Sequence, residues 1–211
     1  MSWHYLTTDS AGWTTPHSIE QEDNAREIWN ILVGLNGWTE NSVAGVLGNM
    51  QHESYLNPGQ WEIGYNYSMQ NGMGLGQWTP ATKVSNYVGS TNRDDMADGN
   101  KQIGLLLSTP SQWTTDYLNP DGSSTYYSET GLPYIDNMSD YSHSNESITD
   151  LTKLWAICWE KPGASQYQRS ISDRIQDAQY WYNLLHGSTP PTPPVPPIHH
   201  KMPLWMYLRR L

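Results

Sequence analysis

Apolar residues recur every three or four positions in several stretches of the chain, which predicts a mostly helical fold. The first stretch, residues 19–36, follows a serine with capping-box spacing, Ser18. The second follows Thr39 and ends near Ser54, and the small residues among its apolar positions predict a buried central helix that neighbouring elements approach closely. Further helices are expected from Thr79-Pro80 to Gly89, from Asp94, Asp95 or Asp98 to Pro110, over 110–118, from Ser147 to Lys161, and from the Ser170–Asp173 capping box to Gly187.

Two stretches lack a helical period. Residues 59–78 alternate weakly and predict one or two short strands or an ordered loop. Residues 119–146 are rich in Asp, Asn, Ser, Gly and Tyr and predict a long irregular connection. The expected fold class is therefore α+β, mostly α, with a buried central helix and a small β hairpin.

Proline marks the expected end of the globular domain. Half of the chain's 14 prolines fall in residues 190–203, which predicts a polyproline II spacer. The expected organisation is an extended arm over 1–17, a globular domain over 18–187, a Pro-rich linker over 188–198 and a final segment over 199–211. That segment is apolar and basic, and it is either a docking tail or the start of a further module.

Charge and composition exclude several kinds of function. The net charge of −10 disfavours nucleic acids and anionic membrane surfaces as partners. No apolar run is long enough to span a membrane, and the N-terminus lacks the pattern of a signal peptide. The histidines show no zinc-ligand spacing, so neither a metal nor another cofactor is expected. The one cysteine, Cys158, lies in an apolar run and is expected to be a small buried hydrophobe.

Glu53 is the leading candidate for chemistry. It lies at the C-terminal end of the predicted central helix, among apolar and aromatic neighbours. The helix dipole and an apolar setting both raise the pKa of a carboxyl group, as a general acid near neutral pH requires. Glycoside cleavage uses such an acid beside the bridging oxygen. The alternative is a surface glutamate near a helix end.

Three motifs resemble those of a known family. They are Gln51–Pro58 (QHESYLNP), Gly74–Thr79 (GLGQWT) and Trp159–Pro162 (WEKP), and they occur in the order found in the phage tail lysozyme family. That family is akin to goose-type lysozymes and soluble lytic transglycosylases. The resemblance covers about residues 20–187 and implies a lysozyme-like fold, with Glu53 as the catalytic acid and Gln77 as a sugar contact. It also implies that the substrate is peptidoglycan, cut between N-acetylmuramic acid and N-acetylglucosamine.

The second catalytic group is left open. Glu62 and Ser68 follow Glu53 at the spacing at which one branch of phage lysozymes carries Asp and Thr. Glu62 is either the base that activates water or an exposed loop residue, and water held by other groups or the substrate's acetamido group are alternatives to it. Glu160 is expected to be a structural residue of the substrate groove that forms hydrogen bonds near Glu53 or at the groove floor. The other expected groove residues, each of which could instead be a packing residue, are Tyr65, Asn66, Tyr67, Trp78 and Tyr134.

Three functions remain open from the sequence. The first is a peptidoglycan glycoside hydrolase of a phage tail or similar virion device, acting at the bacterial cell wall. The second is a lytic transglycosylase that leaves anhydromuramic ends. The third is a non-catalytic wall-binding tail module. Other virion tail proteins are expected as possible partners of residues 199–211.

Overall fold

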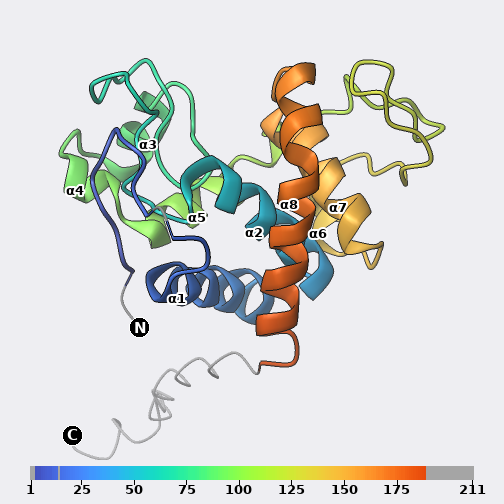
Figure 1. The fold of residues 1–211 in the computed structure, drawn as a ribbon, viewed down its shortest axis with the longest axis horizontal. Helices are drawn as coiled ribbons and strands as arrows, with labels where there is room; N and C mark the ends of the chain where they lie inside the picture. Colours follow the sequence, from blue (N-terminus) through green and yellow to red (C-terminus); the bar gives the residue numbers. More distant parts are fainter. Residues whose placement is uncertain (1–2, 14, 189–211) are drawn as a thin grey trace, which may run out of the picture.

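The computed structural model of the protein describes residues 3–13 and 15–188, and it is mostly helical, as expected (Figure 1). The α-helices are α1 (Ile19–Trp29), α2 (Glu40–Ser54), α3 (Thr82–Val88), α4 (Arg93–Met96), α5 (Gly99–Ser108), α6 (Met138–Ser142), α7 (Ile148–Trp155) and α8 (Ala164–Leu185). Two π-helical segments, η1 (Asn30–Leu35) and η3 (Ala156–Glu160), directly continue α1 and α7, and a 3₁₀ turn, η2, covers Pro110–Gln112. The expected linker and tail lie outside the described residues from 189 onward.

Helix α2 is the buried central helix that the sequence predicts. The Thr39 side chain accepts a hydrogen bond from the Ser42 backbone and caps its first turn. Gly48 lies so close to α8 that a Cβ at this position would come within 2.7 Å of the Ala178 Cβ. A Cβ at Gly45 would likewise come within 3.1 Å of the α7 backbone at Leu151. The small residues therefore bring two other helices against α2, which carries Glu53 in its last turn.

The helices around α2 form two groups. Figure 1 shows α3, α4 and α5 on one side of α2 and α6 and α7 on the other, with α8 crossing α2. A single hydrophobic core joins the helices, and many of its largest side chains are tryptophans, such as Trp29, Trp61, Trp155, Trp159 and Trp181. Cys158 is fully buried within it, as expected. None of the helices in the described ranges is long and apolar enough to cross a membrane.

The expected hairpin over residues 59–78 consists of an ordered loop with isolated bridges. Trp61 pairs with Met73 in one antiparallel bridge, and Thr8 of the N-terminal segment pairs with Gln60 in a parallel one. The buried side chain of Gln102 on α5 holds the loop in place, because its amide oxygen accepts from the Leu75 backbone at 2.9 Å. Side-chain and single-bridge contacts thus replace the ladder of a regular hairpin.

Two predicted helix starts are wrong. Ser170 does not open the last helix, which begins at Ala164 after the N-cap Gly163, and Ser170 lies buried within α8. Thr79 does not cap α3, whose N-cap is Ala81. The Thr79 hydroxyl donates instead to the Gln77 carbonyl at 3.1 Å, so it is not available to the helix.

Two other predicted segments differ in extent. The helix expected over 110–118 is only the short turn η2, after which Trp113 takes an extended conformation and packs its ring into the core. The connection over 119–146 is largely irregular, as expected, but its last part forms α6. Asn137 caps this helix by accepting from the Asp140 backbone.

Candidate active site

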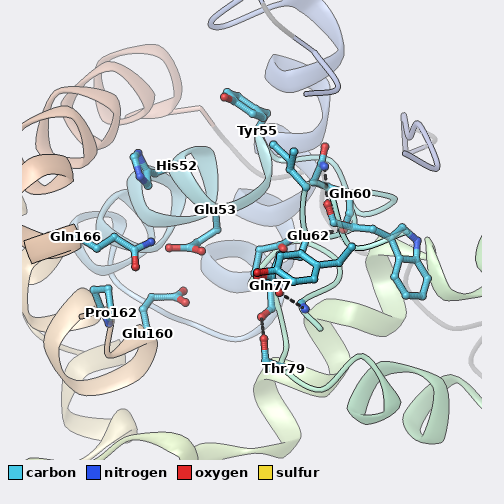
Figure 2. Close-up of a pocket in the computed structure, with 14 residues that line it drawn as sticks. His52, Glu53, Tyr55, Gln60, Glu62, Gln77, Thr79, Glu160, Pro162 and Gln166 are labelled. Atoms are coloured by element: carbon cyan, nitrogen blue, oxygen red, sulfur yellow. Dashed lines mark hydrogen bonds between the residues drawn. The ribbon is translucent and has the colours of Figure 1, made fainter. Parts of the chain in front are cut away.

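A cavity of about 440 Å³ opens where α2, the 59–79 loop and the end of η3 meet (Figure 2). Three carboxylates line it, one from each of these elements: Glu53, Glu62 and Glu160. The rest of the lining is polar and aromatic and includes Gln60, Trp61, Tyr65, Gln77, Thr79 and Gln166. Segments far apart in the sequence thus bring acidic groups together over an open hollow.

Glu53 is held by a buried cation. Its carboxylate accepts a charge-assisted hydrogen bond from the guanidinium of Arg174 on α8, whose side chain is fully buried, whereas that of Glu53 is 16% exposed. The same guanidinium donates to the Asn49 side chain at 2.7 Å and to the Ser170 hydroxyl at 3.2 Å. The sequence predicts an apolar setting for Glu53, but the structure places a buried guanidinium against its carboxylate.

The backbone after Glu53 turns sharply. Tyr55 and Leu56 have φ values of 57° and 56°, in the left-handed region that ends the helix. The neighbouring Ser54 hydroxyl donates to the Leu75 carbonyl at 3.0 Å and ties this turn to the loop across the cavity. The end of α2 and the loop are therefore fixed relative to one another.

Glu160 lies on the opposite wall from the loop, with its carboxyl near that of Glu53 (Figure 2). It is the last residue of η3, and the Trp155 indole donates to its carboxyl at 3.1 Å. Burial of this carboxyl, and next the negative charge of Glu53, raise the pKa of Glu160 to about 8. The Glu160 carboxyl therefore holds a proton at neutral pH.

Glu62 is engaged by its own loop. Its carboxylate accepts hydrogen bonds from the Gly72 backbone at 2.8 Å and from the Asn71 side chain at 3.2 Å. These contacts close the loop around residues 62–72 and also orient the carboxylate. Glu62 lines the cavity, as a base for the reaction would have to. Its use as a base stays a prediction.

Gln77 also lines the cavity, where the family resemblance expects a sugar contact. Its side-chain amide donates to the backbone carbonyls of Gln60 and Gly74, both at 3.1 Å. It holds the two ends of the loop together, and within the described residues its amide oxygen accepts no hydrogen bond. That oxygen is the atom left for a ligand.

The other expected groove residues are scattered. Tyr65 lines the cavity and is 53% exposed. Asn66 and Ser68 belong to the same loop but are not among the residues that line the cavity. Trp78 is only 2% exposed and belongs to the core, and it borders two adjacent hollows and not the cavity itself. The ligand contacts predicted for these four residues stay predictions.

Arg174 is the functional residue that sequence reasoning missed. It occurs in a long polar helix, where an arginine is usually solvated. Its signal was its position on the buried face of α8, four residues from both Ser170 and Ala178. A buried arginine needs a carboxylate partner, and that requirement points to Glu53. As for metals, the described part of the chain holds no group of three His, Cys, Asp or Glu side chains that could bind an ion.

Comparison with known proteins agrees with the motif resemblance. The family described as phage tail lysozyme matches residues 23–185 of this chain. A curated relative, "Morphogenesis protein 1" of Bacillus phage B103, is 31% identical over 172 residues, which make up 80% of this chain and 40% of the relative. The chain thus spans about two fifths of the length of that relative. Because this family match covers most of the residues of the chain, the chain belongs to the phage tail lysozyme family.

Proposed function

We propose that the protein is a glycosidase that cuts peptidoglycan between N-acetylmuramic acid and N-acetylglucosamine, with Glu53 delivering the proton to the bridging oxygen. The observation that carries the proposal is the pairing of two carboxyl groups, Glu53 and Glu160, in one polar cavity. Neighbouring carboxyls hold one proton between them more readily than none, because two like charges at close range repel each other.

The two members of this pair have different surroundings. Glu53 forms an ion pair with Arg174, whereas burial beside Trp155 keeps Glu160 protonated at neutral pH. The pair therefore enters the reaction with one proton, stored on Glu160. Transfer of that proton through Glu53 protonates the bridging oxygen, which leaves as the hydroxyl of the departing sugar.

In the hydrolase form of the proposal, Glu62 activates a water molecule that attacks the sugar from the other side. Its hydrogen bonds to Gly72 and Asn71 keep it an oriented acceptor, which supports this role. The same bonds also give Glu62 a sufficient structural purpose, and this favours a second candidate, a lytic transglycosylase. In that reaction the muramic acid's own 6-hydroxyl attacks and no water is consumed.

The decisive experiment measures wall clearing and product masses for the wild type and the variants Glu53→Gln, Glu62→Gln and Glu160→Gln. Glu53→Gln is expected to lose about 100-fold or more of the turnover, the usual contribution of a general acid. Glu146→Gln serves as a matched control, because Glu146 is exposed and does not line the cavity. Circular dichroism of each variant verifies that it is folded.

Three results separate the candidate functions. A hydrated muramic acid end, lost with Glu62→Gln, supports the hydrolase, and an anhydromuramic end supports the transglycosylase. If the wild type binds walls and never cuts them, the protein is a wall-binding module and the glycosidase proposal is wrong. Full activity of Glu53→Gln would also refute it.

The proposal places the protein in a phage tail, acting at the bacterial cell wall. Residues 18–187 then form the catalytic unit, preceded by the arm over 1–17. The Pro-rich residues 188–198 serve as a spacer, and residues 199–211 either dock onto another tail protein or begin a further module. The greater length of the phage relative is compatible with such a module.

A further inference from the structure

Two further hollows extend the cavity away from Glu53. The first, of about 220 Å³, shares Gln77, Thr79 and Glu160 with the cavity and adds Lys83 and Lys161. The second, of about 580 Å³, shares Lys83 with the first. We call the two hollows together the lysine groove, and the residues that they share are Trp78, Lys83 and Gln112.

The lysine groove is a basic region on an acidic chain. The protein has 11 Lys and Arg against 21 Asp and Glu, yet two lysines line the smaller hollow together. Neither lysine forms an ion pair with any of the residues that the structure describes. Lys83 is exposed, and Lys161 donates to the Gln112 carbonyl at 2.9 Å, which leaves two of its N–H groups free.

Trp78 and the protonated Glu160 add hydrogen-bond donors to the lysine groove, beside neutral side chains such as Ser111 and Gln112 that can donate or accept. The Trp78 indole N–H is buried and has no partner in the described part of the chain. Glu160, the one acidic side chain that lines the smaller hollow, has a pKa raised to about 8 by burial and by Glu53. Its carboxyl is therefore mainly uncharged and does not repel an anion. Together with the two lysines, these donors favour a ligand that supplies acceptors and negative charge.

The surroundings of Lys161 act on its pKa in both directions. Burial lowers the pKa most, Asp116 raises it, and the charge of Lys83 lowers it to a smaller extent, so that the net shift is downward. A carboxylate placed between the two lysines would relieve their mutual repulsion. The larger hollow adds an apolar wall from Tyr87 and Leu105, which suits methyl groups.

We infer that the lysine groove binds the peptide stem of the muramic acid next to the cut bond, with a stem carboxylate between Lys83 and Lys161. The inference rests on the proposed function, because the lysine groove joins the cavity through Gln77, Thr79 and Glu160. Peptidoglycan stems carry free carboxylates and alanine methyl groups, which match the donors and the apolar wall. The enzyme would then favour strands that still carry their stems.

The test compares three substrates: glycan strands with their stems, the same strands after an amidase has removed the stems, and N-acetylglucosamine oligomers. The amidase leaves a free lactyl carboxylate on the muramic acid, and the oligomers have none. Lys83→Gln is expected to lower kcat/KM about three- to tenfold on strands with stems, because one charged hydrogen bond near the surface is lost. On stripped strands and on the oligomers, the loss is expected to be less than about twofold. Lys161→Gln should act in the same direction.

Lys101→Gln is the matched control, because Lys101 is an exposed lysine that lines none of these hollows. An equal loss on stem-bearing and stripped strands would assign the lysines to the lactyl carboxylate and overturn the stem assignment. An equal loss on all three substrates, or none on any, would overturn the inference entirely.

A binding measurement keeps this test independent of catalysis. Stem-bearing and stripped strands are titrated into Glu53→Gln, with and without Lys83→Gln, and Kd is measured by calorimetry. The expected result is tighter binding of stem-bearing strands, with the preference lost in the double variant. If the wild type cuts no substrate and this preference is still seen, the glycosidase proposal fails and the stem site stands. Equal binding of both strands refutes the stem site.

Discussion

Replacing Glu53 with glutamine is expected to lower the stability of the protein as well as its activity. The guanidinium of Arg174 is fully buried, and Glu53 is its only charged partner among the described residues. The remaining acceptors, on Asn49 and Ser170, are neutral. Without the carboxylate, a buried positive charge is left without compensation.

The size of the effect follows from exposure and geometry. Breaking a fully buried ion pair costs about 3–5 kcal/mol. The Glu53 side chain keeps 16% of its exposure, and a glutamine oxygen can still accept a hydrogen bond, so we expect a loss of about 1.5–3 kcal/mol. For a domain of this size that lowers Tm by about 4–10 °C. Arg174→Met removes the cation itself and leaves three acceptors without their donor, the Glu53 carboxylate among them, and it should cost about 3–5 kcal/mol.

Urea unfolding of the wild type, both single variants and the double variant gives the coupling energy. The measurement belongs at pH 6, where Glu160 is protonated and relief of its repulsion with Glu53 contributes little. We expect the double variant to be more stable than the sum of the single effects predicts, by about 1.5–3 kcal/mol. A Glu53→Gln variant as stable as the wild type, or more stable, would refute this account of Arg174.

Two other predictions concern stability. Folding raises the pKa of Glu160 from 4.5 to about 8. Between these two pH values the folded state keeps a proton that the unfolded chain releases. The free energy of unfolding should therefore fall by about 1 kcal/mol per pH unit between pH 4.5 and 8. Glu160→Gln should remove that fall, as urea unfolding across this range would reveal; an unchanged slope contradicts the assignment. Gly48→Ala should lower the stability by about 1–3 kcal/mol or more, because the new Cβ would meet the α8 backbone. Gly163→Ala should lower the stability by less than about 1 kcal/mol, because the space around Gly163 is open. Thermal unfolding of both variants measures the two losses. Equal losses in both glycine variants would contradict this packing argument.

Capping residues and small residues in the sequence predicted the central helix correctly, because these features act within one helix or at its ends. The cap at Thr39 and the small residues of α2 gave the central helix and placed Glu53 in its last turn. The start of α8 was missed because Ser170 has capping-box spacing while the true first turn is polar. Only Tyr167 is buried there, so the first turns show no apolar period. Tertiary contact, and not local pattern, starts that helix.

The candidate site was predictable only in part. The motifs contain Glu53, Gln77 and Glu160, and the spacing after Glu53 indicated Glu62. All four residues line the cavity. The contact between Glu53 and Arg174 could not be predicted by spacing, because it joins residues 121 positions apart. The high pKa of Glu160 likewise depends on burial by distant side chains.

The π-helical end of α7 has a consequence for how the site tolerates change. An α-helix turns by about 100° per residue, and a π-helical segment carries more residues per turn than an α-helix. Deleting one residue within Ala156–Glu160 could restore a regular helix at little cost to the backbone. The five residues of the π-helical segment and four residues of an α-helix turn through nearly the same angle, about 400°, so Glu160 would keep close to its present direction. A deletion within the α-helical part of α7, in contrast, would turn Glu160 by about 100° away from the cavity wall. The π-helical segment is thus the place where the chain can change length with little rotation of Glu160.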